Sequence, residues 1–600
     1  MEKSSAVYEP FVRPAPTRAP KMSMWTRVRS VLFYCVLAYW LYFLGSIWVY
    51  LYQMGIDERA SWEIHNLADA FDWNKLPPSE TLEWVRCYEE PFQCARLMVP
   101  LNYAKPHMQK AAVALIKYPA KYPVGHEKWR GPILFNPGGP GGSGVDTIHA
   151  RGANMSKIIG DDFDMIGFDP RGIGRTRPKL AVLESESERM TWQLQLPPPI
   201  NVTVDALAKI YGYWQIMADL VVERQAHAAA HMSTAIVARD MLQITKAHGR
   251  DKLQYWGFSY GTVLGITFSA MFPDNVGRVI VDGVADTENY YSGAWDNNLL
   301  DTDKDLATVL ESCAASSACP LREKTGDLVG NRLDAILNNL KTEPIPVRNG
   351  SIYGLVDYSL AHSLIFRALY KPVTSFPALF AALAEVEKGN GQPLYTLSGL
   401  TTSSWRCECS SGGGALPESV GETTAAIACG DADVVDHDLP QLKEHYANMA
   451  RLSSFADVWH VHAHCAAWKI RPVERFNGPF VGNTSFPMLF IGNTADPVTP
   501  LWAAKKMSKG FKDAVVLTQN SPGHCSTAAT SLCTSKYIRA YFRNGTLPKP
   551  GTVCEDDDDI FPPDDKVDVD LAVLSVEDRE LLHAARDFSA GFEVPRLGFI

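Results

Sequence analysis

The stretch that most constrains the fold of this 600-residue chain is Leu253–Gly261, LQYWGFSYG. A short apolar run leads into Ser259, which has a glycine two residues away on each side, and a helix-compatible segment follows. In this context G-x-S-x-G forms a sharp strand-to-helix turn that exposes a serine. Side chains at Gly257 and Gly261 would collide with the neighbouring strand and helix as the chain reverses. Because the pattern also occurs by chance in long chains, its meaning depends on the other segments.

Strand-like and helix-like segments alternate around this turn. Residues 111–120, 131–139, 163–172 and 276–284 have the apolar character of short strands, and helices are predicted over 232–248 and 261–272. Short buried strands separated by helices predict a mostly parallel sheet that helices cover on both faces. The fold class is therefore α/β.

The pattern changes between residues 286 and 484. Residues 328–343, 358–370 and 376–389 have helical periodicity without the rhythm of strands, and a Gly-rich loop follows them at 407–418. Strand-like segments resume after residue 484. We therefore predict a core over 81–285, a large, mainly helical cap insertion over 286–484, and the second part of the core with a C-terminal tail over 485–600. The acidic run Glu555–Asp559 lacks the spacing of a calcium loop and is interpreted as a solvated surface loop.

A serine hydroxyl is a weak nucleophile and needs a base that a carboxylate holds in place. Asp496 follows the strand-like residues 488–491, and His524 follows 514–517. The order Ser, Asp, His is that of α/β-hydrolases, and all three side chains would project at the carboxyl edge of the sheet. The candidate catalytic residues are Ser259, Asp496 and His524.

A glycine-rich loop, NPGGPGGSG at 136–144, follows the predicted strand PILF. Backbone N–H groups of such a loop stabilise developing negative charge, so the predicted oxyanion donors are the N–H groups of Gly138, Gly139 and Tyr260. A phosphate-binding P-loop is excluded because the loop lacks a Lys-Ser/Thr ending.

These motifs together resemble a known family. NPGGPGGSG, FDPRGIGRTRP, WGFSYGTVLG, VDGVAD, GNTADPVTP and a later GHCS resemble the tripeptidyl- and prolyl-aminopeptidase family of α/β-hydrolases, with the tripeptidyl-aminopeptidase-like members closest. The resemblance covers residues 80–555. It implies the triad and oxyanion loop above, a helical cap over the site, and neither a metal nor another cofactor. Smaller relatives begin the glycine loop with His, where this chain has Asn136 and Pro137.

The resemblance also implies roles outside the triad. Asp169 and Arg171 in FDPRG are expected to be scaffold residues. Cleavage near a free N-terminus needs an anion to hold the substrate amine, and Glu408, Glu418 and Asp431 in the cap are the candidates.

A long uncharged segment near the start predicts a membrane anchor. No charged residue occurs from Ser30 to Ile56, which at about 1.5 Å per residue is long enough to cross a bilayer. Basic residues precede it and acidic residues follow. The positive-inside rule then predicts a cytosolic tail over 1–29, a transmembrane signal anchor over 30–56, a stem over 57–80 and a lumenal or extracellular catalytic domain. The alternatives are a cleaved signal peptide, whose apolar region should be shorter, and a buried core helix.

Cysteines and glycosylation motifs agree with that topology. Eleven of the 12 cysteines follow the apolar segment, and the close pairs Cys87/Cys94 and Cys313/Cys319 suit local disulfides in an oxidising compartment. Because eleven is odd, at least one is free or paired with another chain. Five N-x-S/T motifs are candidate glycosylation sites: Asn154, Asn201, Asn349, Asn483 and Asn544.

Three further groups have competing interpretations. His460, His462 and His464 would share one face of a strand and could ligate zinc, but no fourth ligand is spaced to match, so core or polar cap histidines are favoured. Cys407 and Cys409 are expected in disulfides. Cys525, beside His524, is expected as half of a disulfide rather than as a nucleophile.

The sequence therefore predicts a membrane-anchored serine hydrolase that cleaves short peptides near a free N-terminus through an acyl-enzyme. The alternatives are an esterase, lactonase or thioesterase with the same triad, and a non-catalytic ectodomain, which usually lacks a triad residue. An epoxide hydrolase or dehalogenase would have Asp at position 259. The net charge of -10 with no basic stripe argues against a nucleic-acid partner, and the oligomeric state is left open.

Overall fold

The computed structural model describes residues 71–350, 352–399, 420–562 and 574–592. The chain divides into two units, Met1–Asp72 and Trp73–Ile600, and the described helices and strands all belong to the second. The predicted anchor at 30–56 lies outside the described residues, as does most of the predicted stem. No helix within the described ranges combines the length and the apolar character that crossing a membrane requires. The end of the stem belongs to the folded unit, because Trp73 and Leu76 are buried in it.

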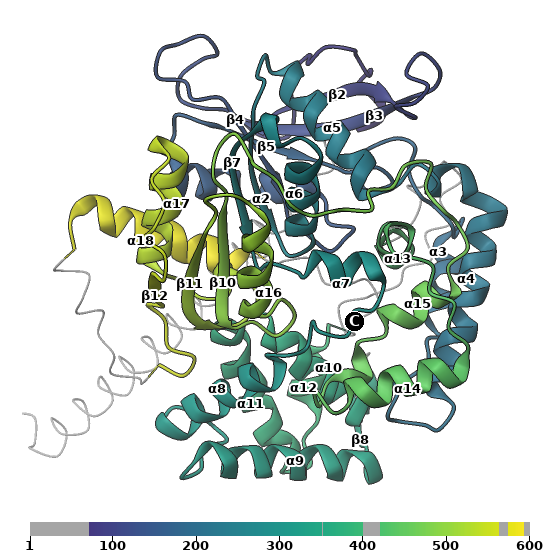
Figure 1. Ribbon diagram of the computed structural model, residues 1–600. Helices are drawn as coiled ribbons and strands as arrows, with labels where there is room; N and C mark the ends of the chain where they lie inside the picture. Colours follow the sequence, from purple (N-terminus) through teal and green to yellow (C-terminus); the bar gives the residue numbers. More distant parts are fainter. Residues whose placement is uncertain (1–70, 351, 400–419, 563–573, 593–600) are drawn as a thin grey trace, which may run out of the picture. The chain divides into compact units, whose positions relative to one another are not determined.

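A ten-stranded sheet forms the core of this unit (Figure 1). Its order is β1-β2-β3-β5-β4-β6-β7-β10-β11-β12. Pairing is antiparallel from β1 to β5 and parallel from β5 to β12. The predicted mostly parallel sheet is confirmed. The strands are β1 Val85–Arg86, β2 Gln93–Pro100, β3 Lys110–Tyr118, β4 Pro132–Asn136, β5 Asp164–Phe168, β6 Leu253–Phe258, β7 Val276–Asp282, β10 Leu489–Ala495, β11 Val515–Pro522 and β12 Val553–Glu555.

Helices cover both faces of the sheet, as two neighbouring residues of β6 show. Tyr255 faces the helix that follows β6, and its hydroxyl donates to the Gly261 carbonyl oxygen over 2.8 Å. Trp256 points the other way and packs against Phe542 of α17 and Phe588 of α18, because successive strand side chains alternate between faces. The core helices are α2 Gly144–Ile159, α5 Thr234–Ala247, α6 Tyr260–Met271, α16 Leu501–Met507, α17 Leu532–Asn544 and α18 Val576–Gly591.

A mainly helical insertion separates β7 from β10, as predicted (Figure 1). It contains one small hairpin that the periodicity did not predict, made of β8 Ile345–Asn349 and β9 Ile352–Val356. Its helices are α7 Thr287–Ser292, α8 Thr302–Ala315, α9 Gly326–Thr342, α10 Tyr358–Leu369, α11 Pro372–Val386, α12 Gln392–Leu397, α13 Val420–Asp431, α14 Leu439–Met449 and α15 Val461–Ala467.

A second segment joins this cap. Helices α3 Glu186–Gln193 and α4 Ala206–Ala229 lie between β5 and α5, inside the range predicted as core. Helix α4 packs against α13, α14 and α15, and Trp214 of α4 stacks on His464 at 3.9 Å between ring centroids. The cap is therefore built from two separate stretches of the chain. The 65 residues between β5 and α5 (169–233) were the available sequence signal, because one crossover connection needs far fewer residues.

The FDPRG turn has the predicted scaffold role. The Asp169 carboxylate accepts hydrogen bonds from the N–H groups of Val145 and Arg175, which fixes the start of α2. Arg171 donates to both carboxylate oxygens of Asp240, over 2.7 and 2.8 Å, and to the carbonyl oxygens of Pro100 and Leu101. Both members of this ion pair are fully buried, so it joins β2, the turn after β5 and α5.

The cysteine and surface predictions have mixed outcomes. The local disulfides Cys87–Cys94 and Cys313–Cys319 are present, together with Cys429–Cys465 and Cys533–Cys554. Cys407 and Cys409 lie outside the described residues. Of the glycosylation candidates, Asn154 is half-buried within α2, whereas the other four are exposed: Asn201, Asn349, Asn483 and Asn544.

The acidic run after β12 is more than a solvated loop. The carboxylates of Asp557 and Asp558 accept hydrogen bonds from the N–H groups of Leu532 and Thr530 at the start of α17. Negative charge at this position also complements the positive end of the helix dipole.

Candidate active site

Ser259 stands at the turn between β6 and α6, as the sequence predicts. Its backbone has φ 57° and ψ -121°, a conformation that non-glycine residues adopt at a cost and that is typical of functional sites. The glycines permit the turn: a Cβ on Gly257 would lie 2.4 Å from the Gly261 carbonyl oxygen, and one on Gly261 would lie 2.7 Å from that of Asn136. The half-buried serine side chain therefore faces the space beneath the cap.

Asp496 and His524 form a buried pair. Nδ1 of His524 lies 3.0 Å from both carboxylate oxygens of Asp496, and both side chains are almost fully buried. The carboxylate also accepts from the N–H groups of Val498, Thr499 and Cys525. Because these donors fix the carboxylate, it can hold the imidazole with Nε2 available as a base.

The third candidate catalytic residue, Ser259, is not hydrogen-bonded to this pair. Among the described residues, Ser259 Oγ has no hydrogen bond with His524. Catalytic hydrogen bonds are often long in the absence of substrate and tighten when it binds. The structure thus places Ser259, Asp496 and His524 at one edge of the sheet, at the ends of β6, β10 and β11.

The prediction that Cys525 is half of a disulfide is wrong. Cys525 is a free, buried thiol. Its Sγ lies 3.7 Å from His524 Nε2 and 3.4 Å from the Asp282 carbonyl oxygen. Burial, with the nearby charge of Asp282 as the next cause, raises the pKa of this thiol well above its ordinary value. A buried thiol that stays protonated is a poor nucleophile.

We expect Cys525 to resist alkylation in the folded protein, because the thiolate is the reactive species and neither it nor a path to it is available. Iodoacetamide followed by peptide mass spectrometry should leave Cys525 unmodified under native conditions and modify it in urea. Rapid modification of the native enzyme at pH 7 would contradict this assignment.

Two of the three predicted oxyanion donors are available. The Gly138 N–H is already bonded to Asn136 Oδ1 over 3.0 Å, which corrects that prediction. The N–H groups of Gly139 and Tyr260 have no acceptor among the described residues, and both residues line the cavity at Ser259. A Cβ on Gly138 would lie 2.9 Å from Ser259 Cβ. The absence of a side chain at Gly138 therefore lets the glycine loop approach Ser259 closely, while its N–H is not available to an oxyanion.

Asp282, which no sequence motif singled out, joins the serine turn to the histidine loop. Its carbonyl oxygen accepts from the Ser259 N–H over 3.0 Å. Its carboxylate accepts from the N–H and hydroxyl of Ser526, over 2.8 and 2.5 Å, and from the Trp256 indole. Asn493 supports the same loop by donating to the carbonyl oxygens of Gly523 and Cys525. The VDG stretch that ends β7 was the only sequence signal.

Burial raises the pKa of Asp282 from 3.8 to about 6, against the hydrogen bonds from Ser526 that lower it. The pKa of Asp282 is higher in the folded state than in the unfolded chain. Asp282 therefore makes its full contribution to the stability of the fold below about pH 4, and this contribution is lost as the pH rises through about 6. The loss is roughly 3 kcal/mol. Asp282→Asn should flatten this part of the pH dependence of the unfolding temperature between pH 4 and 7. An identical slope in the variant would contradict the assignment.

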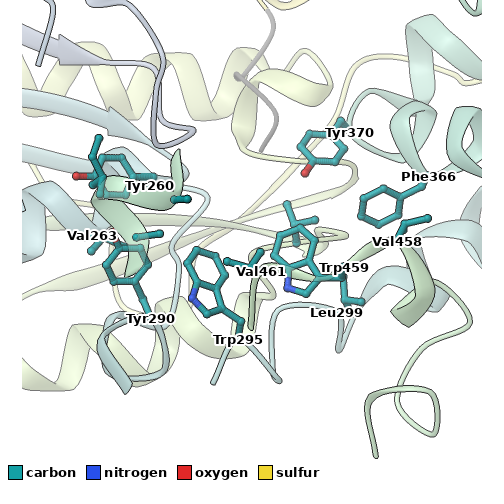
Figure 2. Close-up of a cluster of buried hydrophobic side chains, with 14 of the residues drawn as sticks. Tyr260, Val263, Tyr290, Trp295, Leu299, Phe366, Tyr370, Val458, Trp459 and Val461 are labelled. Atoms are coloured by element: carbon teal, nitrogen blue, oxygen red, sulfur yellow. The ribbon is translucent and has the colours of Figure 1, made fainter. Parts of the chain in front are cut away.

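A cavity lined by aromatic side chains lies beside Ser259. Figure 2 shows part of its wall, with Tyr260, Tyr290, Trp295, Tyr370 and Trp459 from the serine turn and the cap. A larger cavity is lined by Gly141 and Gly142, but Ser259 does not line it. We place the candidate site at the smaller cavity because Ser259 lines it.

Asp431 is not available to bind a substrate amine. It is fully buried, and its carboxylate accepts from the N–H and hydroxyl of Thr234 and from the Tyr290 hydroxyl. Burial raises its pKa to about 6. Glu408 and Glu418, the other amine-binding candidates, lie outside the described residues.

The cap histidines do not share a strand face. His460 precedes α15, and His462 and His464 lie within it. His460 and His464 are hydrogen-bonded to each other over 2.8 Å, whereas His462 bonds to His437 and the Gly293 carbonyl oxygen. The three imidazoles therefore do not converge on one point.

Among the described residues, one group has potential metal-ligand atoms that lie within 4.8 Å of one another. It consists of Asp496, His524 and Cys525. Metal ligands must be deprotonated and free to coordinate. The Asp496 carboxylate already accepts several N–H groups, and the thiol is protonated, so these residues suit proton transfer better than metal binding.

Comparisons with known proteins agree with this geometry. The family model described as "alpha/beta hydrolase fold" matches residues 131–375, and the "TAP-like protein" model matches 452–554. Serine protease Hip1 of Mycobacterium tuberculosis is 26% identical over 494 residues, which are 79% of this chain and 91% of the relative. Tripeptidyl aminopeptidase of Streptomyces lividans is 26% identical over 503 residues, 79% of this chain and 86% of the relative.

A third relative is named as an esterase and not as a peptidase. Carboxylesterase B of Mycobacterium tuberculosis is 26% identical over 480 residues, 77% of this chain and 86% of the relative. The two family models together include the serine turn, the acid and the histidine. These matches and the geometry of the site support a TAP-like α/β-hydrolase, and the chain is a hydrolytic enzyme.

Proposed function

We propose that this protein is a serine aminopeptidase that releases short peptides from N-termini through an acyl-enzyme. The observation on which the proposal rests is the strained Ser259 turn beside the buried Asp496–His524 pair, with Nδ1 of the imidazole 3.0 Å from the carboxylate. Ser259 Oγ attacks the scissile carbonyl carbon while His524 Nε2 accepts its proton. The N–H groups of Gly139 and Tyr260 stabilise the resulting oxyanion.

The second half of the reaction uses the same groups. Protonated His524 gives its proton to the leaving amine, and the ester between Ser259 and the acyl group remains. Water then attacks this ester as His524 takes a proton from it, which releases the acid and regenerates the serine. Asp496 stabilises the imidazolium in both halves without accepting the proton.

Labelling with a fluorophosphonate probe tests the nucleophile. Wild-type protein should be labelled, and Ser259→Ala should not be labelled at all. His524→Ala should be labelled much more slowly, because the serine lacks its base. Equal labelling of all three proteins would exclude this triad.

A substrate panel separates peptidase from esterase. An N-terminally free tripeptide amide, its acetylated form and a simple ester are compared by kcat/KM. Preference for the free tripeptide supports the aminopeptidase. Turnover of the ester alone would favour the alternative of an esterase, lactonase or thioesterase, for which the carboxylesterase name among the relatives is the specific support.

We also propose that residues 30–56 anchor the enzyme in a membrane, with residues 1–29 cytosolic and the catalytic domain lumenal or extracellular. The support is the absence of charge in this segment and the basic-to-acidic change across it. Alkaline extraction of membranes should leave the full chain in the pellet and release a variant lacking residues 1–56. If the exposed N-x-S/T motifs carry glycans, digestion with a glycosidase should increase the electrophoretic mobility of the full chain. Release of the full chain by alkali would contradict the anchor.

A further inference from the structure

Two indole N–H groups in the wall of the Ser259 cavity have no hydrogen-bond acceptor among the described residues. They belong to Trp295 and Trp459, whose ring centroids lie 6.1 Å apart. The two residues are only 5% and 3% exposed, respectively, so bulk water does not surround them. Leaving a buried donor unpaired costs about 1–3 kcal/mol. Figure 2 shows both rings beside the serine turn, between Tyr290 and Phe366.

The backbone at one of these residues is strained. Trp295 has φ 54°, in the left-handed region that bulky residues rarely adopt. Such strain persists only where the surrounding structure imposes it, and it is concentrated at ligand sites. Packing of the ring against Tyr290, with centroids 5.2 Å apart, holds the indole in the cavity wall.

Other polar groups of the wall already have partners. The Tyr260 hydroxyl is bonded to the Thr234 hydroxyl over 2.6 Å, and the Tyr290 hydroxyl donates to Asp431 over 2.8 Å. The Asn298 amide donates to the Val498 carbonyl oxygen over 3.0 Å. An indole N–H can only donate, so a ligand that satisfies Trp295 and Trp459 must supply an acceptor.

The acceptor must also be neutral. Within the described residues, no Asp, Glu, Lys, Arg or His lines this cavity. A buried carboxylate would lose its hydration without gaining an opposite charge, whereas a carbonyl oxygen pairs with an indole N–H at no such cost. A peptidyl group has two carbonyls in reach: one enters the oxyanion hole and the next one along the peptide remains. A simple ester has only the first.

We propose that Trp295 and Trp459 form a subsite that binds the second carbonyl of a peptidyl group, counted from the scissile bond, and so selects peptides over simple esters. This subsite rests on the proposed function, because it assumes that Ser259 is acylated. It defines the preferred substrate as one whose acyl part contains at least one further amide carbonyl next to an apolar side chain.

The test compares two substrates and four proteins. One substrate is a dipeptide p-nitroanilide, and the other is its analogue with the second carbonyl replaced by a methylene group. Wild-type enzyme is compared with Trp295→Phe and Trp459→Phe, which keep an aromatic ring but lose the N–H. The matched control is Trp468→Phe, because the Trp468 indole also has no acceptor among the described residues but does not line the cavity.

Wild-type enzyme should prefer the complete dipeptide by about tenfold in kcat/KM, and each cavity variant should lose most of this preference. Trp468→Phe should retain it. Fluorophosphonate labelling of each variant checks that Ser259 still reacts. Equal cleavage of both substrates by wild-type enzyme, or an unchanged preference in both cavity variants, would overturn the subsite and leave the peptidase intact. Cleavage of neither substrate by wild-type enzyme would overturn the proposed peptidase function and the subsite with it.

Discussion

Replacing Ser259 with alanine should lower kcat/KM for the tripeptide substrate by about 10⁴-fold or more. The strained turn holds the hydroxyl at the end of β6, and no other described nucleophile is placed to replace it, since the neighbouring thiol of Cys525 is buried and protonated. Steady-state kinetics with active-site titration of the wild type give the measurement.

The same experiment tests whether Ser259 and His524 act as one unit. His524→Ala alone should cost about as much as Ser259→Ala, and the double variant should cost little more than either. Circular dichroism of each variant checks that it remains folded, so that a loss of activity is not a loss of the fold. The proposed triad would be contradicted if the loss of kcat/KM in the double variant equalled the product of the two single losses. A loss of kcat/KM below tenfold in Ser259→Ala would also contradict it.

Replacing Arg171 with methionine should lower the free energy of unfolding by about 3–5 kcal/mol. The guanidinium is 1% exposed and makes two bonds to Asp240. Without it, the carboxylate of Asp240 remains buried, with Tyr103 as its remaining side-chain donor over 2.7 Å. The shift of the urea unfolding midpoint measures the loss.

An exposed ion pair provides the control for Arg171. Arg86 pairs with Glu90 at the surface, where the two side chains are 82% and 71% exposed. Arg86→Met should change stability by less than about 1 kcal/mol, because solvent screens such pairs. Equal effects of the two substitutions would show that burial of the Arg171–Asp240 pair has no special importance.

Local patterns predicted most of the core. The turn at Ser259, the strands around it and the helices of the cap follow from periodicity and glycine placement, which depend on residues near one another in the sequence. The chain order of Ser259, Asp496 and His524 predicted that these three candidate residues lie at one edge of the sheet, because parallel strands bring their carboxyl ends to the same edge. Helices α3 and α4 were assigned to the wrong domain, since periodicity predicts a helix but not its packing partner.

The amino-acid sequence by itself determined the chemistry: a serine on a sharp turn, an acid and a histidine that follow strands, and a glycine loop. Only the tertiary structure decided which groups are free to act. It bonds the Gly138 N–H to Asn136, leaves Cys525 unpaired beside His524, and uses Asp431 to hold Thr234 and Tyr290. Hydrogen-bond partners and burial depend on contacts between distant segments, and no local pattern records them. The cavity wall of Trp295, Tyr370 and Trp459 arises for the same reason, because three separate cap segments meet at one serine.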